Sequence, residues 1–276
     1  MRIGAVSYLN TKPLVYRLAE LAPECEIVFD LPSRLADRLA EGTLDVALIP
    51  SIEYFQRPDR YQIVSNACIA CRGPVRSVKL FSRVPVERIR TLALDEGSRT
   101  SVALVRILLA EREGVRPRLM PFPIDAPPEA IEADALLMIG DRAMHRPVGS
   151  FVAEWDLGDV WCRWTELPFV FAMWVARRES QEPLIAAMAT GHACEQLAVS
   201  LQRARDSGVQ HVEEIAAREH AKVGISQAEC VQYLRDHLHF ELGPRELAGL
   251  KLFQQHAVRL GLAPSAEQRP AGTFGR

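Results

Sequence analysis

The chain has 276 residues, of which 48% are apolar and 25% are charged, and this ordinary globular composition excludes a wholly disordered protein. Its 33 basic and 35 acidic residues give a net charge of −2, which leaves no surplus of positive charge for binding nucleic acid or an anionic membrane. The length suits one large domain or two modest ones, and we expect two lobes.

The N-terminal stretch RIGAVSYLNTKPLVYRL begins as a strand and ends as an amphipathic helix. The strand is predicted at residues 2–6, and the helix after it has Asn10 or Thr11 as its N-cap. Ser7, Tyr8 and Asn10 lie between the two elements. They can be a well-capped turn, because Asn and Thr are preferred caps, or they can be part of a binding site.

A β-α-β pattern follows. We predict strands at 25–30 (CEIVFD) and 44–50 (LDVALIP) on either side of a helix at 32–42 that ends at a glycine. Extended runs follow at 61–73 and 77–83. The alternation of strands and helices predicts a parallel sheet with right-handed crossovers.

A second α/β series starts near residue 91. It has a strand at 92–94, a polar turn, a helix that ends at Gly114, and strands at 118–124 and 133–141. From about residue 181 to residue 262 the apolar spacing is helical throughout. We therefore expect an α/β protein with a two-lobed architecture and a helical C-terminal part.

The chain is expected to leave the first lobe, build the second and return. Lobe 1 is predicted to comprise residues 1–80 and 173–262, and lobe 2 residues 81–172, with a loose tail at 263–276 that has proline, glycine and charge without periodicity. Parallel α/β sheets bind ligands beyond the carboxyl ends of their strands. A ligand cleft is therefore predicted between the lobes.

Polar residues follow several predicted strands at these carboxyl ends. Such residues often do no more than cap helices, but hydroxyls, glycines and free helix amides also hold a carboxylate or phosphate well. The candidates are Ser7, Tyr8 and Asn10; Ser51; Ser98, Thr100 and Ser101; and Gly140 with Asp141. Because strong acids and bases are few among them, a polar, carboxylated small molecule is the expected ligand.

The remaining features argue against other classes of protein. Gly-x-Gly-x-x-Gly and Walker motifs are missing. Cys68 and Cys71 have the spacing of a redox pair but lie in a strand-like run, and His237 and His239 have no cysteine pair or HExxH motif nearby, so we expect no cofactor and no metal. The N-terminal apolar run is too short for a signal peptide, and the stretch LPFVFAMWVA is about half the roughly 20 residues of a membrane span. A cytoplasmic protein is expected, without nucleic-acid or membrane partners, and the sequence specifies no oligomeric state.

Several motifs resemble the chorismate dehydratase family of the futalosine route to menaquinone. They are GAVSYLNTKPLVYRL, LDVALIPSIEYF, GPVRSVKLFSRVP, TLALDEGSRTSVALVRILL, LLMIGDRAM and ELPFVFAMWVARR, in the family's order and spacing over residues 1–178. The resemblance implies a type II periplasmic-binding-protein-like fold used by a cytoplasmic enzyme. It also implies a lyase (hydro-lyase) reaction in which chorismate loses water to give 3-[(1-carboxyvinyl)oxy]benzoate.

The resemblance assigns roles to particular residues. It implies that Asn10 and Ser77 are catalytic, with Asn10 positioning the substrate through hydrogen bonds. The other candidates would bind carboxylates or line the cleft. No evident general base is present, so the enolpyruvyl carboxylate of the substrate is the expected proton acceptor. Two alternatives stay open: 1,4-dihydroxy-6-naphthoate synthase of the same pathway, and a non-catalytic binding module for a small carboxylate.

Overall fold

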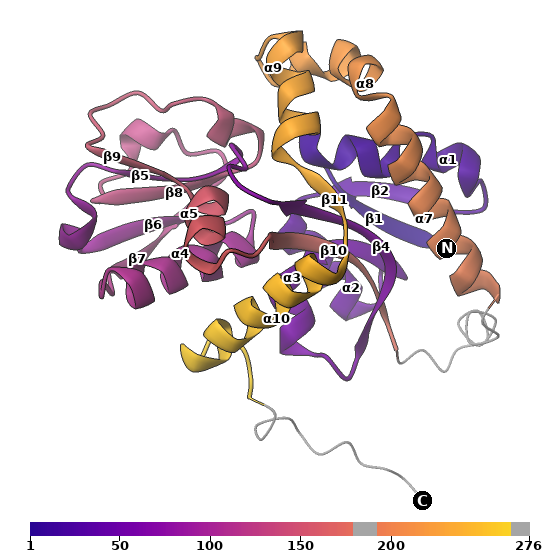
Figure 1. Ribbon diagram of the computed structural model, residues 1–276, viewed down its shortest axis with the longest axis horizontal. Coiled ribbons are helices and arrows are strands. Elements are labelled where there is room, and N and C mark those ends of the chain that lie inside the picture. Colours follow the sequence, from indigo (N-terminus) through magenta and orange to yellow (C-terminus); the bar gives the residue numbers. More distant parts are fainter. Residues whose placement is uncertain (179–191, 266–276) are drawn as a thin grey trace, which may run out of the picture.

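A computed structural model describes residues 1–178 and 192–265 of the chain. Figure 1 shows two lobes, each built on its own β-sheet, with the C-terminal helices lying over the first lobe and the junction. The first sheet has the strand order β11-β4-β10-β3-β1-β2, and the second has the order β7-β6-β8-β5-β9. The expected two-lobed α/β architecture is thereby confirmed.

The elements run in chain order as follows. The first lobe opens with β1 (Arg2–Val6), η1 (Leu9–Val15), α1 (Leu18–Leu21), β2 (Glu26–Asp30), α2 (Pro32–Glu41), β3 (Val46–Pro50), α3 (Ser51–Gln56) and β4 (Tyr61–Cys71). The second contains β5 (Val78–Ser82), η2 (Val86–Arg88), β6 (Thr91–Asp95), α4 (Arg99–Arg112), β7 (Arg118–Phe122), η3 (Pro128–Ala130), β8 (Ala135–Ile139), η4 (Asp141–Met144), β9 (Ala153–Asp156) and α5 (Leu157–Thr165). The return comprises β10 (Phe169–Arg177), α7 (His192–Gln210), α8 (Val212–Glu219), η5 (His220–Lys222), α9 (Gln227–Gln232), the π-helix η6 (Tyr233–His237), β11 (His239–Glu241) and α10 (Pro244–Arg259).

The sheets are mixed, whereas the sequence predicted parallel pairing. The βα units do pair in parallel, β1 with β2 and β3, and β6 with β7 and β8. However, β10 lies antiparallel between β3 and β4, and β5 lies antiparallel between β8 and β9. These strands enter their sheets from the other lobe rather than through a βαβ crossover, so the rule for parallel units does not govern them.

Two crossings join the lobes, at residues 72–77 and 166–168, because β4 and β10 belong to the first sheet and β5 and α5 to the second lobe. The predicted boundaries at 80/81 and 172/173 fall inside β5 and β10. The division into lobes at those residues stays a prediction. The predicted tail at 263–276 lies mostly outside the described residues.

The segment after β1 is a 3-10 helix, and neither Asn10 nor Thr11 caps it. Tyr8 occupies the N-cap position, and Thr11 is fully buried inside the helix. Packing explains this outcome: α7 lies so close that a Cβ on its Gly208 would come within 2.0 Å of the Pro13 carbonyl oxygen. Tertiary contact therefore overrides the capping pattern, and the Asn10 side chain has no capping role.

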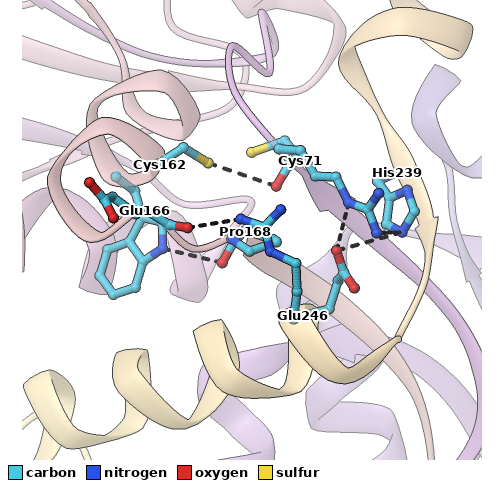
Figure 2. A network of polar contacts seen from close by, with 9 residues as sticks. Cys71, Cys162, Glu166, Pro168, His239 and Glu246 are labelled. Carbon is cyan, nitrogen blue, oxygen red and sulfur yellow. Dashed lines mark hydrogen bonds and ion pairs between the residues drawn. The ribbon is translucent and has the colours of Figure 1, made fainter.

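In the described C-terminal residues 192–265 the regular elements are helices except for β11, a short strand that the sequence did not predict; the first part of the predicted helical stretch, residues 181–191, lies outside the described residues. β11 pairs antiparallel with β4. The following helix α10 packs against both crossings: Arg72 Nε donates to the buried Glu246 at 2.8 Å, and Arg245 donates to the Glu166 carbonyl at 3.0 Å. Figure 2 shows this network from close by. Among the described residues, no helix combines the length and apolar character needed to cross a membrane.

Candidate active site

A cavity lies between the lobes and is lined by residues of both. Its polar lining residues are Tyr8, Asn10, Ser77, Ser98 and Ser101, together with the backbone of Gly140. Apolar residues complete it: Val6, Pro32, Pro50, Ile69, Val75, Val78, Ile139, Phe171 and Ala172. No charged side chain is among these lining residues, so a ligand meets neutral hydrogen-bonding groups.

Ser77 lies in the first crossing, where the loop is held by a carboxylate. Asp156, the N-cap of α5, accepts hydrogen bonds from the backbone N–H groups of Val75 at 2.9 Å and Arg76 at 2.6 Å. Arg76 has a φ of 62°, a left-handed conformation that is costly for a residue with a Cβ. The loop is therefore fixed by contacts with the second lobe, and it presents Ser77 to the cavity.

Behind Ser77 lies a buried tyrosine from the C-terminal part, Tyr233. The Tyr233 hydroxyl donates to Ser77 Oγ at 2.9 Å, and the Asn10 side chain lies close to the same hydroxyl. The Thr11 hydroxyl donates to Asn10 Oδ1 at 3.2 Å. Asn10 also lines the cavity, so its amide N–H groups are available to a ligand there.

Another side of the cavity is formed by the start of α4. Ser98 is the N-cap and its side chain accepts a hydrogen bond from the Ser101 N–H, while the two hydroxyls are 3.1 Å apart. α4 has 14 residues, so its free amides and dipole favour an anion at this end. This edge of the cavity suits a carboxylate.

Tyr8 reaches from the first lobe into the second, between two glycines. A Cβ on Gly97 would come within 2.8 Å of the Tyr8 hydroxyl, and one on Gly140 within 2.8 Å of its ring. Gly140 also has a φ of +66°. Only glycine therefore allows this approach at either position. Burial raises the pKa of Tyr8, and its hydroxyl has no hydrogen-bond partner among the described residues.

An ion pair supports the two glycine loops from behind. Arg142 Nε donates to the buried Asp95 carboxylate at 2.9 Å. The same carboxylate accepts from the N–H groups of Gly97 at 2.9 Å and Ile139 at 3.3 Å. The Arg142 guanidinium also lies 4.2 Å from the centre of the Phe122 ring. Sequence reasoning did not single out this pair, because nothing local links residues 95 and 142.

Asp141 acts across the lobes instead of lining the cavity. Its carboxylate accepts a hydrogen bond from the Leu9 N–H at 3.0 Å, at the start of η1. Burial raises its pKa to about 6, although the Leu9 N–H and Lys12 favour the charged form; Glu219 and His145 also lie near. The predicted cavity-lining role is thus not supported by its position, because the carboxylate is used as an inter-lobe contact.

This geometry predicts a pH-dependent stability. An ordinary aspartate titrates near 4, so folding favours protonated Asp141, whose pKa is about 6. The free energy of unfolding should fall as the pH rises from about 4 to about 6. Asp141→Asn, which still accepts from Leu9, should remove at most about 3 kcal/mol of this fall. Urea unfolding of the wild type and of Asp141→Asn between about pH 4 and pH 6 measures this effect. A difference in unfolding free energy between the two proteins that does not change with pH would contradict the assignment.

Three further candidates also lie outside the cavity lining. Ser7 is exposed. The Ser51 hydroxyl donates to the Val170 carbonyl at 2.7 Å and lies 3.4 Å from the Thr100 hydroxyl, which accepts from the Ile52 N–H. Ser51 and Thr100 are fully buried where the lobes meet, and their hydroxyls form hydrogen bonds with the backbone and lie within reach of each other. The predicted contact of all three with a ligand is not supported by these positions.

The other six candidates do share the cavity: Tyr8, Asn10, Ser77, Ser98, Ser101 and Gly140. The residue that sequence reasoning missed is Tyr233. In the stretch ECVQYLRDH it has the spacing of an ordinary buried helix position, and no local signal sets it apart. Its place beside Ser77 arises only from the packing of the C-terminal part on the junction.

Comparisons with known proteins identify the family of this chain and relatives of its fold. The sequence matches the menaquinone biosynthesis family over residues 1–259. It is 29% identical, over 279 residues, to a protein named chorismate dehydratase from Thermus thermophilus, covering 95% of this chain and 96% of that protein.

Solved structures with lower identity share the fold. Protein AF1704 from Archaeoglobus fulgidus is 16% identical with a TM-score of 0.73, covering 95% of this chain and 97% of the other. The periplasmic aliphatic sulphonate binding protein SsuA from Escherichia coli is 15% identical with a TM-score of 0.62, covering 100% and 94%. The fold is thus that of the periplasmic binding proteins, two α/β lobes around a ligand site.

Proposed function

The chain belongs to the menaquinone biosynthesis family, and from that premise we propose that it is a chorismate dehydratase, a hydro-lyase that converts chorismate to 3-[(1-carboxyvinyl)oxy]benzoate and water. The name of the Thermus thermophilus relative supports this substrate. The observation that carries the proposal is the meeting of Asn10, Ser77, Ser98 and Ser101, from three separate segments, around one cavity.

The reaction asks for positioning more than for strong acids and bases. The C3 proton of chorismate is vinylogous to the ring carboxylate, and the neighbouring C4 carries the hydroxyl that leaves. When the C3–H bond breaks, its electron pair forms the C3–C4 double bond, the C4–O bond breaks, and the ring becomes aromatic. Much of the driving force is therefore already in the substrate, and the protein needs to orient it and stabilise developing charge.

The ring carboxylate is assigned to the start of α4. Negative charge builds on this carboxylate as the C3 proton leaves, and the Ser98 and Ser101 hydroxyls with the free amides of α4 are donors fixed in advance. Because these donors are neutral, they do not have to be desolvated as ions when the substrate enters. Asn10 and Ser77 are left for the enolpyruvyl and C4 hydroxyl side.

The proton acceptor is assigned to the substrate itself. None of the cavity-lining residues is an aspartate, glutamate or histidine. Burial raises the pKa of both Tyr8 and Tyr233, so their hydroxyls stay protonated at neutral pH. The enolpyruvyl carboxylate, attached at C3, is then the group within reach of the proton.

The experiment is to mix purified protein with chorismate and to follow products by chromatography, with buffer alone as the control for spontaneous rearrangement. The expected product has a benzoate chromophore and the mass of chorismate less one water. No turnover, with tight binding of some other acid, would contradict the proposal in favour of a binding module. Turnover of a different substrate of the menaquinone pathway would contradict the proposal and favour 1,4-dihydroxy-6-naphthoate synthase.

A further inference from the structure

Tyr233, from the described C-terminal part, is a buried tyrosine whose hydroxyl contacts Ser77, a polar residue of the cavity. It begins the π-helix η6, is 1% exposed, and is not among the residues that line the cavity. Its hydroxyl donates to Ser77 Oγ at 2.9 Å. Single π-turns inside helices often occur at functional sites, because the extra residue shifts a side chain out of the ordinary register.

The backbone of Ser77 is already fixed without Tyr233. The Ser77 N–H donates to the Val75 carbonyl at 2.8 Å, and the Ser77 carbonyl accepts from the Gly140 N–H at 2.8 Å. What these bonds leave undetermined is the direction of the Ser77 hydroxyl proton. Because Tyr233 donates to Ser77 Oγ, the Ser77 proton does not point back at Tyr233 and is available to an oxygen in the cavity.

The order of donation is then Tyr233 to Ser77, and Ser77 into the cavity. Hydrogen bonds in such a chain polarise one another, so the terminal donor is strengthened as well as aimed.

We propose that Tyr233 is a positioning residue of the dehydration, aligning the Ser77 hydroxyl on the substrate without touching it. This inference rests on the proposed function. It makes the C-terminal part a component of the site, although the strand-end loops alone supply the lining donors.

Tyr233→Phe tests the proposal, because it keeps the ring and removes only the hydroxyl. The expected result is a kcat for chorismate lowered about tenfold to a hundredfold, the scale of a misaligned catalytic donor, with KM changed less than about threefold. The matched control is Tyr16→Phe. It removes a hydroxyl that donates to Glu214 at 2.8 Å outside the cavity, and it should keep full activity.

A double-mutant cycle with Ser77→Ala distinguishes positioning from a general structural role. If Tyr233 acts through Ser77, adding Tyr233→Phe to Ser77→Ala should lower kcat less than about threefold further. Full additivity, a wild-type kcat for Tyr233→Phe, or a Phe variant that fails to fold would each overturn the inference. A wild-type protein without activity on chorismate would instead contradict the proposed function, so the two failures are distinguishable.

Discussion

Asn10→Ala should lower kcat for chorismate dehydration about a hundredfold or more, the typical loss when a fixed donor to the reacting groups is removed. The side chain lines the cavity, and its oxygen accepts a hydrogen bond from Thr11. The alanine variant therefore removes the amide N–H groups that would donate to the substrate. The melting temperature should change little, since Asn10 does not cap η1 and Asp141 accepts the Leu9 N–H. Steady-state kinetics and thermal unfolding measure both effects.

The companion variant is Asn10→Asp, which has nearly the same shape but offers only acceptors when ionised. It should be at least as impaired as the alanine variant, because it removes the donors and adds a negative charge beside a dianionic substrate. Wild-type kcat in either variant would contradict the role assigned to Asn10. A large fall in melting temperature with Asn10→Ala would instead indicate that Asn10 stabilises η1.

Gly140→Ala should impair both stability and activity. The φ of +66° with a ψ of −154° lies where residues with a Cβ are strained, which costs of order 1–3 kcal/mol of unfolding free energy. In addition, the new Cβ would lie 2.8 Å from the Tyr8 ring and push the lobes apart at the cavity. We expect kcat/KM to fall about a hundredfold, as expected when a donor set is displaced by about 1 Å.

Gly114→Ala is the matched control, because Gly114 has a φ of +68° but no atom within 4 Å of the place where its Cβ would lie. It should lose about 1–2 kcal/mol of stability from its left-handed conformation and keep wild-type activity. The difference between the two variants reports the contact with Tyr8 together with the more strained backbone of Gly140. Equal kcat/KM in both would contradict the idea that this close approach shapes the site.

The sequence was sufficient for the parts of the fold that local patterns determine. Strands such as 44–50 and the helix at 32–42, with Pro32 in its first turn and Gly42 closing it at a φ of 82°, follow from apolar spacing and end signals. The antiparallel pairing of β10 and the short strand β11 could not be predicted from such local patterns. Their pairing depends on chain segments about 100 or more residues away, which carry no local signal.

The same division holds in the site. Residues after strands, such as Asn10 and Ser98, could be proposed from the rule that ligands bind at carboxyl ends of parallel strands. Ser51 and Thr100 have the same local setting, but they hydrogen-bond each other and the backbone. Tyr233 lies behind Ser77 through tertiary packing alone. Which hydroxyls face the cavity and which are satisfied elsewhere is decided by lobe contacts, not by local sequence.

The measurement that tests the central claim most directly is a crystal structure of the protein with 3-[(1-carboxyvinyl)oxy]benzoate bound. The product should fill the cavity between the lobes, with its ring carboxylate within hydrogen-bond distance of Ser98 and Ser101 at the start of α4. Asn10 and Ser77 should contact its enolpyruvyl side. Product bound outside this cavity, or with an ionised side chain on its carboxylates in place of these donors, would contradict the assignment of this site.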